Sequence, residues 1–399
     1  MEYDVIIVGA GPAGSSAAQL LAEEGFAVLL LDRTSFPREK ICGDGLTPGT
    51  VKLLKELNVL PLLTKQKRYS VYAIRFATPR LQILDVPFDS KHEGSEFLVI
   101  PRKELDYALW QKARTSGAQF EVGTVKDLLF EENRVVGCLV DFNGTWQKRY
   151  AKIVIGADGA ASIVARILNP QKVHPKHRFL AIRAYVEGFK TLPNLVEFYW
   201  TNELKPGYFW IFPLGESTAN IGLGLPADLY LKSDFNLKKL FFDYLERPMF
   251  AQRKTNTFEV HSLRTWPIPL AGVRNFTRVF DGALLIGDAG YWVDPLSGEG
   301  IHNALKSGMI AAETVSEALR SRRTDRSFLT QYEQHCQNAL GGVIRRSLWF
   351  VWGMRHLPWL LESYFWLARR NPLAFRKFFS HLSKDFEFKF IPEQKEKMD

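Results

Sequence analysis

The chain has 399 residues, of which 46% are hydrophobic and 24% charged, and its net charge is +9. This composition is typical of a folded globular protein and excludes a disordered or collagen-like chain, while the length predicts two or three domains. The three cysteines, Cys42, Cys138 and Cys336, are too few for a disulfide framework, so we expect a reducing compartment.

The N-terminus, MEYDVIIVGAGPAG, has no basic region before its apolar run, so we expect no signal peptide. No run of about 18 uninterrupted apolar residues occurs, so we expect no membrane-spanning helix. Together these features predict a cytoplasmic protein.

The first predicted element is a strand over 3–8, which leads through a glycine-rich turn into a helix over 15–24. A second predicted strand, over 27–31, is followed by Asp32. A strand before a GxGxxG turn, a helix after it and an acid at the end of the next strand are the context that a dinucleotide site requires. We therefore predict that the chain binds a dinucleotide.

The three glycines of this turn have different tasks in such a site. Gly9 permits the tight turn, Gly11 lets the backbone approach a pyrophosphate, and Gly14 lets the helix pack closely on the sheet. The helix N-terminus supplies partial positive charge to the phosphates, and Asp32 is expected to accept hydrogen bonds from the adenosine ribose.

Two later segments also place a carboxylate at the end of a buried strand. A predicted strand over 152–158 ends in Asp158, and another over 283–290 carries Asp288 near its end. Open α/β sheets bind ligands at the carboxyl ends of their strands. A long helix is predicted to start near Gly298, where its N-terminal amides can neutralise negative charge on a bound ligand.

The GxGxxG turn, GADG at 156–159 and GDAG at 287–290 resemble the three FAD-contacting motifs of the para-hydroxybenzoate hydroxylase-like flavoproteins. Within that group, four further segments resemble the geranylgeranyl reductase family, namely PREKICGDGL at 37–46, the helix start Arg102-x-x-Leu105-Asp106, YFWIFPLG at 208–215 and DPLSGEGI at 294–301. The resemblance extends from residue 1 to about residue 320.

The resemblance implies an α/β protein with a discontinuous Rossmann-type FAD-binding domain, an inserted antiparallel β-sheet substrate domain and C-terminal helices. The expected FAD-binding domain comprises 1–70, 96–175 and 277–335, the substrate domain 71–95 and 176–276, a basic, tryptophan-rich helical region 336–391 and a polar tail 392–399.

The resemblance also implies that Asp288 meets the ribityl or phosphate side of the flavin, that the amides over 298–301 face the ring, and that Asp158 supports the site. The full set of residues expected at the FAD is Gly9, Gly11, Pro12, Ala13, Gly14, Asp32, Arg33, Gly43, Arg102, Val125, Asp158, Gly159, Gly287, Asp288, Pro295, Gly298, Gly300 and Ile301.

Between the second and third of these motifs, alternating apolar residues predict five antiparallel strands, over 179–188, 196–200, 208–213, 219–225 and 258–267. Tyr208 and Trp210 share one face of their strand, and the opposite face is also apolar. Two interpretations remain open: these aromatics cover a flavin and its apolar substrate, or they form an ordinary β-sandwich core.

Cys42 lies in a glycine-rich loop where a ligand can reach it, whereas Cys138 is expected in a strand core. In the resembled family this loop lies beside the flavin ring and the substrate. Cys42, Tyr208 and Trp210 are therefore our candidate catalytic residues, although a free cysteine is often simply a small buried hydrophobe.

The positive charge is concentrated near the C-terminus. Residues 344–381 carry seven Lys or Arg against the single acid Glu362, together with four of the ten tryptophans. The segment is helical in type, with an expected kink near Pro358. Three interpretations remain open: contact with a membrane surface or the mouth of a lipid tunnel, packing on the FAD domain or a partner subunit, and, less favoured, nucleic-acid binding.

The leading functional hypothesis is FAD-dependent reduction of C=C double bonds in a polyprenyl lipid. The glycines at 222–224 lack the strand-end acid of a second dinucleotide site, so NAD(P)H visits transiently or another electron donor serves. Neither a Ser-His-Asp order nor a His/Cys cluster with metal-ligand spacing occurs, and no metal is expected.

Three rival hypotheses remain. A monooxygenase or halogenase shares the fold, and Trp210-Ile-Phe-Pro213 partly resembles the halogenase WxWxIP pattern, although Tyr208 replaces its first tryptophan and Lys40 belongs to a different motif. An electron-transfer flavoprotein that reduces a membrane quinone would be expected to carry a cysteine cluster. A non-catalytic flavin-binding protein would keep the glycine motifs without access to the ring.

Overall fold

The N-terminal apolar strand is an inner strand of an eight-stranded sheet. Both of its faces are buried, which is why its sequence is apolar throughout. The structure, a computed structural model, describes residues 2–64, 68–87, 96–357 and 359–371. The strands of this sheet are β1 (Tyr3–Val8), β2 (Val28–Asp32), β8 (Gln119–Val122), β9 (Thr124–Glu131), β10 (Arg134–Phe142), β11 (Thr145–Gly156), β17 (Val279–Phe280) and β18 (Ala283–Leu285).

The order β17-β18-β11-β1-β2-β8 is parallel from β18 to β8, as a dinucleotide-binding sheet requires. β11 begins at Thr145 rather than at Lys152, because its first half pairs with β10 in an antiparallel meander that β9 completes.

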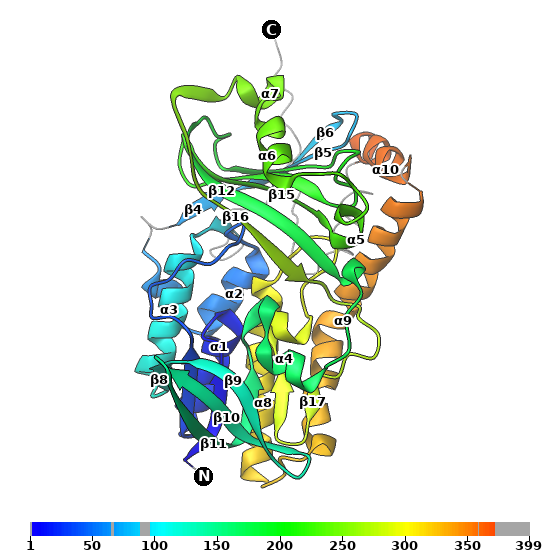
Figure 1. The fold of residues 1–399 in the computed structure, drawn as a ribbon. Coiled ribbons are helices and arrows are strands. Elements are labelled where there is room, and N and C mark those ends of the chain that lie inside the picture. Colours follow the sequence, from blue (N-terminus) through cyan, green and yellow to red (C-terminus); the bar gives the residue numbers. More distant parts are fainter. Residues whose placement is uncertain (1, 65–67, 88–95, 358, 372–399) are drawn as a thin grey trace.

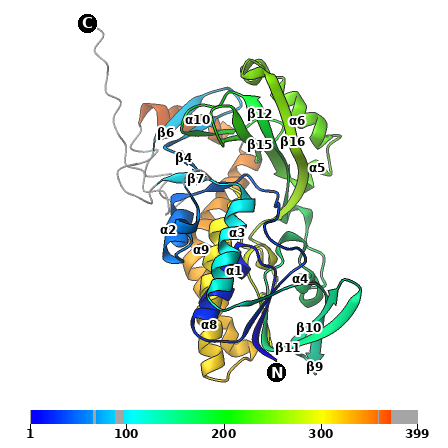
Figure 2. The ribbon, with the colours of Figure 1, turned by 90° about the vertical axis from the view of Figure 1, so that its left-hand side faces the viewer.

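Three helices, α1 (Pro12–Glu23), α3 (Arg102–Thr115) and α8 (Ile301–Arg320), cover one face of this sheet, and the β9-β10-β11 meander lies on the other side (Figure 2). α1 begins at Pro12, earlier than predicted, since proline is favourable in the first turn of a helix. The helix predicted near Gly298 begins at Ile301, because Gly298 adopts a φ of +68°, which an α-helix excludes.

A second, seven-stranded sheet stands above the first (Figure 1). Its strands are β5 (Ala73–Ala77), β6 (Ile83–Pro87), β12 (Arg178–Phe189), β13 (Leu195–Tyr199), β14 (Tyr208–Pro213), β15 (Thr218–Pro226) and β16 (Lys254–Pro269). The order is β16-β12-β15-β14-β13-β5-β6, and its neighbours are antiparallel except β13 and β5. The sheet was predicted to be antiparallel, but the pair β13 and β5 is parallel, because β5 comes from a segment much earlier in the chain.

Shorter elements connect and cover the two sheets. The helices are α2 (Pro48–Glu56), α4 (Ile163–Leu168), α5 (Ala227–Tyr230), α6 (Leu237–Leu245) and α7 (Pro248–Ala251). The 3₁₀ turns are η1 (Leu60–Leu62), η3 (Gly159–Ala161), η4 (Pro175–His177) and η5 (Gly287–Gly290), and a small sheet contains β3 (Gly45–Leu46), β4 (Tyr69–Val71) and β7 (Phe97–Val99).

Two C-terminal helices, α9 (Arg326–His356) and α10 (Trp359–Arg370), run from the lower sheet to the upper one (Figure 1). Pro358, where we expected a kink, lies outside the described residues, as do residues 372–399 with the predicted polar tail. Within the described ranges, every helix is too short or too polar to cross a bilayer.

Candidate active site

A cavity of about 1030 Å³ lies between the two sheets. The carboxyl ends of β1, β2 and β11, the loop after β2, the inner face of the upper sheet and the helices α9 and α10 all contribute to its lining. This volume is at the upper end of the range for small-molecule sites. Its lining divides into a polar half at the lower sheet and an apolar half between the upper sheet and the C-terminal helices.

The glycine turn after β1 opens its backbone to the polar half. A Cβ on Gly14 would stand 1.9 Å from the carbonyl oxygen of Gly9, so Gly14 allows α1 to pack on the turn and does not itself line the cavity. A Cβ on Gly11 would meet Arg38 Nη2 only at 3.9 Å, with no closer described neighbour. The backbone at Gly11 is therefore accessible to a ligand.

Asp32 lines the cavity and also holds the turn in place. Its Oδ2 accepts a hydrogen bond from Ala10 N at 3.0 Å, and its Oδ1 accepts one from Thr34 N at 3.1 Å. Arg38 reaches Asp32 Oδ2 at 3.4 Å and Asp106 Oδ2 at 3.2 Å, and it lines the cavity as well. Arg38 was missed from the sequence, although basic residues after the strand-end acid are a signal for an anionic ligand.

Asp158 has a structural task at the edge of the cavity. Its Oδ2 accepts from Ile163 N at 2.7 Å at the start of α4, and its Oδ1 accepts from the Ser162 hydroxyl. Burial raises the pKa of Asp158, and the bond from Ser162 opposes that effect. The adjacent Gly159 has a φ of +76° and lines the same edge.

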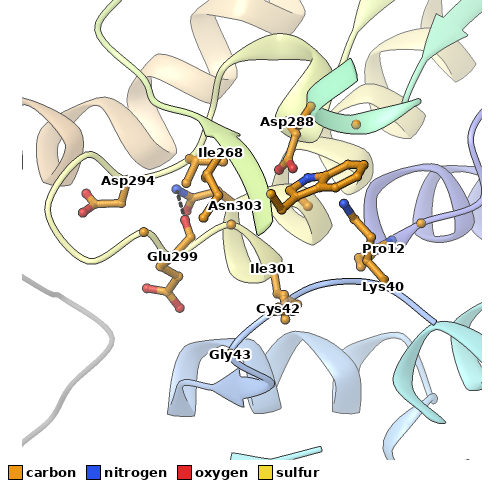
Figure 3. Close-up of a pocket in the computed structure, with 18 of the residues that line it drawn as sticks. Pro12, Lys40, Cys42, Gly43, Ile268, Asp288, Asp294, Glu299, Ile301 and Asn303 are labelled. Atoms are coloured by element: carbon orange, nitrogen blue, oxygen red, sulfur yellow. Dashed lines mark hydrogen bonds between the residues drawn. The ribbon is translucent and has the colours of Figure 1, made fainter. Parts of the chain in front are cut away.

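Asp288 and Lys40 both line the polar half, and their side chains lie on either side of an indole ring (Figure 3). Burial raises the pKa of the Asp288 carboxyl, and the Lys40 ammonium opposes that effect. Burial lowers the pKa of Lys40 to about 8, although Asp288 acts in the opposite direction. Lys40 Nζ lies 3.8 Å from the centre of the Trp266 ring. The cavity thus holds a lysine whose pKa is lowered to about 8.

Arg102 is the first residue of α3, and its guanidinium is paired with the carboxylate of Asp106. Its Nε and Nη2 donate to the two carboxylate oxygens of Asp106 at 2.6 and 2.9 Å, and the guanidinium lines the cavity. Burial raises the pKa of the neighbouring Cys42 thiol, whereas Arg102 acts to lower it. Cys42 is therefore a protonated thiol at neutral pH.

The aromatic side chains on the two faces of β14 have different surroundings. Tyr208, Trp210 and Phe212 line the cavity, whereas Phe209 and Ile211 pack into the core beneath α6. The cavity wall therefore consists of one face of this strand, and the opposite face belongs to an ordinary core. Further apolar side chains complete the wall, namely Phe179, Phe198, Ile268, Leu340, Ile344, Phe350 and Phe365.

Most residues expected at the FAD line this cavity, and three do not. Those that do are Gly9, Gly11, Pro12, Ala13, Asp32, Arg33, Gly43, Arg102, Val125, Asp158, Gly159, Asp288, Gly298, Gly300 and Ile301. Gly14, Gly287 and Pro295 lie outside the lining. Gly287 packs against α1, where an added Cβ would be 2.9 Å from that of Ala13, and Pro295 is buried within the loop that precedes α8.

The polar half fits a dinucleotide. It offers open backbone at Gly11, the N-terminus of α8 after Gly300, and the cationic side chains of Arg38 and Lys40. Within the described part of the chain, no group of three or more His, Cys, Asp or Glu side chains could hold a metal ion.

A family model described as FAD binding domain matches residues 2–347. The digeranylgeranylglycerophospholipid reductase of Methanosarcina acetivorans is 32% identical over 363 residues, 87% of this chain and 83% of that protein. The menaquinone reductase of Mycolicibacterium smegmatis is 32% identical over 326 residues, which cover 78% of this chain and 76% of that protein.

Among solved structures, a geranylgeranyl bacteriochlorophyll reductase-like protein from Thermoplasma acidophilum matches with a TM-score of 0.80 at 25% identity, over 89% of this chain and 88% of that one. A flavin-dependent brominase matches with a TM-score of 0.74 at 20% identity, over 91% of this chain and 94% of that one, and so shares the fold. The chain belongs to the FAD-binding domain family and is an FAD-dependent oxidoreductase of the geranylgeranyl reductase type.

Proposed function

We propose that this protein reduces C=C double bonds in the chain of a polyprenyl lipid. The observation that carries the proposal is the division of one cavity into a half that fits FAD and a half walled by aromatic and aliphatic side chains. A polyprenyl chain is long and apolar, so it matches the second half while its double bond lies next to the first.

When bound and reduced, FAD supplies the hydride that an alkene needs. The chain itself supplies the positioning and the dry environment that an unactivated double bond requires. Trp210 and Phe212 from β14 and Phe179 from β12 form a wall that excludes water. Saturation also takes up one proton, and we propose that the Cys42 thiol holds it at Sγ.

We propose that NAD(P)H or another electron donor reduces the flavin without a second dinucleotide domain. The pair Gly222 and Gly224, which has the spacing of such a site, lies inside β15, where Trp210 and Phe179 pack directly over the two glycines. Gly222 and Gly224 therefore serve the packing of the cavity wall and offer no second dinucleotide site. We propose that the electron donor instead approaches the flavin through the cavity that also takes the lipid.

We further propose that α9 and α10 contact a membrane surface through residues of the 344–381 segment. Trp349, Trp352, Trp359 and Trp366 expose 73, 50, 60 and 51% of their surface. Leu340 and Ile344 of α9 and Phe365 of α10 line the cavity instead. Exposed tryptophans interspersed with arginines suit an anionic bilayer interface, so the lipid would enter from this side.

Sedimentation with anionic liposomes tests the membrane proposal. We expect Trp349→Ser combined with Trp352→Ser to lower binding by about tenfold. Trp146→Ser is the matched control, because Trp146 is 61% exposed on β11, on the lower sheet. Equal binding by the double variant and the control would remove the proposal.

The proposed reaction is tested by product mass under anaerobic conditions. The reduced flavoprotein is mixed with geranylgeranyl diphosphate, and we expect products that gain two hydrogens for each reduced bond. Products that gain oxygen or a halogen, formed only when oxygen is admitted, would assign the protein to the monooxygenase or halogenase branch instead.

A further inference from the structure

Two neighbouring strands of the upper sheet, β12 and β15, bring polar side chains under the loop that carries Cys42. In register, Tyr185 of β12 is opposite Asn220 of β15, and Asn220 is opposite Phe212 of β14. Asn220 has no exposed surface, and the residues on either side of it in β15 are apolar and buried. A buried amide in a strand is costly unless its hydrogen bonds are satisfied.

The amide of Asn220 connects two walls of the cavity. Its Oδ1 accepts a hydrogen bond from Trp210 Nε1 at 3.1 Å, and its Nδ2 donates to the carbonyl oxygen of Cys42 at 2.8 Å. The same Nδ2 also donates to Asp44 Oδ2 at 2.8 Å. One side chain therefore joins the aromatic wall to the loop that carries the thiol.

Asp44 fixes the other end of this loop. It is fully buried at a φ of +67°, and its carboxylate accepts from Tyr185 Oη at 2.7 Å and from Arg102 N at 3.3 Å. Its carbonyl oxygen accepts from Ile100 N at 2.9 Å. The loop is thus held from the upper sheet and from the start of α3.

Two glycines make room for this connection. A Cβ on Gly222 would stand 2.2 Å from Trp210 Cζ2, so the indole lies across Gly222 with its N–H directed at Asn220. A Cβ on Gly43 would stand 3.5 Å from Trp210 Nε1 and 3.2 Å from Phe212 Cε2. The loop therefore packs directly on the aromatic wall.

We propose that Asn220 is a positioning residue for the reaction, because its amide holds the Cys42 loop against Trp210 at the junction of the two halves of the cavity. The proposal rests on the proposed function, in which Cys42 and Trp210 border the reacting double bond. A loss of these bonds misplaces the groups that border the substrate. Misplacement by about 1 Å costs on the order of a hundredfold in rate.

The test compares Asn220→Ala with Asn169→Ala. Asn169 is also buried, and its amide bonds to the backbone of Thr277 at 2.9 and 3.1 Å outside the cavity lining. Two readouts are taken: alkylation of Cys42 by iodoacetamide, located by peptide mass, and anaerobic reoxidation of the reduced flavoprotein by geranylgeranyl diphosphate. Cys138 and Cys336 are fully buried and report unfolding.

In the Asn220→Ala variant, we expect iodoacetamide to alkylate Cys42 about tenfold faster than in the wild type. We also expect the rate of flavin reoxidation to fall by about tenfold or more, with little change in the KM for the substrate. Asn169→Ala should match the wild type in both readouts. If Asn220→Ala fails to fold, Asn220→Asp keeps the shape and the acceptor for Trp210, loses the donation to the Cys42 carbonyl oxygen and places a second carboxyl group against Asp44. The double variant Asn220→Asp with Asp44→Asn restores a donor–acceptor pair and should recover part of the rate.

A change in one readout alone, or equal changes in Asn220→Ala and Asn169→Ala, would overturn the proposal. Absence of turnover by the wild type would refute the proposed function instead. Cys42 alkylation would then decide by itself whether Asn220 holds the loop, since that readout needs no substrate.

Discussion

The two halves of the cavity are built in different ways. The polar half consists of short segments at strand ends, where Gly11, Asp32 and Asp288 occupy positions set by the lower sheet. The apolar half takes Tyr208, Trp210 and Phe212 from β14 and further side chains from β12, α9 and α10, which are far apart in the chain. The polar half therefore follows from several local motifs, whereas only the β14 part of the apolar half has one, at 208–215.

This difference has a physical cause. A cofactor with phosphates needs backbone amides and charges at fixed places, so few sequences satisfy it. An apolar chain needs volume and exclusion of water, which many combinations of side chains provide. Substitutions in one half should consequently leave the other half unchanged, and the following experiments test that independence.

The largest effect is expected at the glycine turn. Gly14→Ala places a methyl group 1.9 Å from the carbonyl oxygen of Gly9 and should cost about 3 kcal/mol or more of stability. Gly11→Ala should keep the melting temperature of the FAD-free protein and weaken FAD binding by about tenfold or more, since its methyl group enters the space of the pyrophosphate. Thermal unfolding and FAD titration separate the two.

Gly215→Ala is the control for both variants, because its Cβ would meet only Thr218 Cβ, at 3.9 Å. Equal loss of stability in the Gly11 and Gly14 variants would contradict the different roles assigned to the two glycines.

The next effect concerns the apolar half. Val343 lines the cavity from α9, and Val343→Trp should fill part of the space for the lipid. We expect kcat/KM for a twenty-carbon prenyl substrate to fall by about tenfold, with FAD affinity unchanged. Val343→Leu adds far less volume and should be nearly neutral. A parallel loss of FAD affinity in the tryptophan variant would show that the halves are not independent.

A smaller effect should follow the charge of Lys40. Because its pKa is lowered to about 8, the side chain is an ammonium below that pH and neutral above it. FAD is anionic, so its affinity should fall by about fivefold as the pH rises from 7 to 9. Lys40→Arg keeps its charge and should remove this pH dependence while binding tightly. The same slope in Lys40→Gln would assign the titration to another group.

The polar half could be predicted because its signals are local. The strand, the turn and the helix over 3–24 follow from neighbouring residues, and most of the residues expected at the FAD line the cavity. Gly14, Gly287 and Pro295 do not: Gly14 lets α1 pack on the turn, which is the packing role predicted for it, and Gly287 packs against α1.

The rest depended on tertiary contacts that no local pattern encodes. In the sequence, Asn220 is one polar residue within the apolar strand predicted over 219–225, and only the register of β12, β14 and β15 brings it to Trp210 and Cys42. The contribution of α9 to the cavity could not be read from its sequence, since its apolar residues equally suit packing on the lower sheet, where Leu340 and Ile344 also contribute.

The central claim is that one cavity joins the flavin to an unsaturated apolar chain. It is tested most directly by stopped-flow reoxidation of the reduced flavoprotein without oxygen, with geranylgeranyl diphosphate and with its fully saturated counterpart. The account predicts fast reoxidation by the unsaturated lipid and none by the saturated one, at equal binding. Reoxidation by neither lipid, or by both at the same rate, would contradict it.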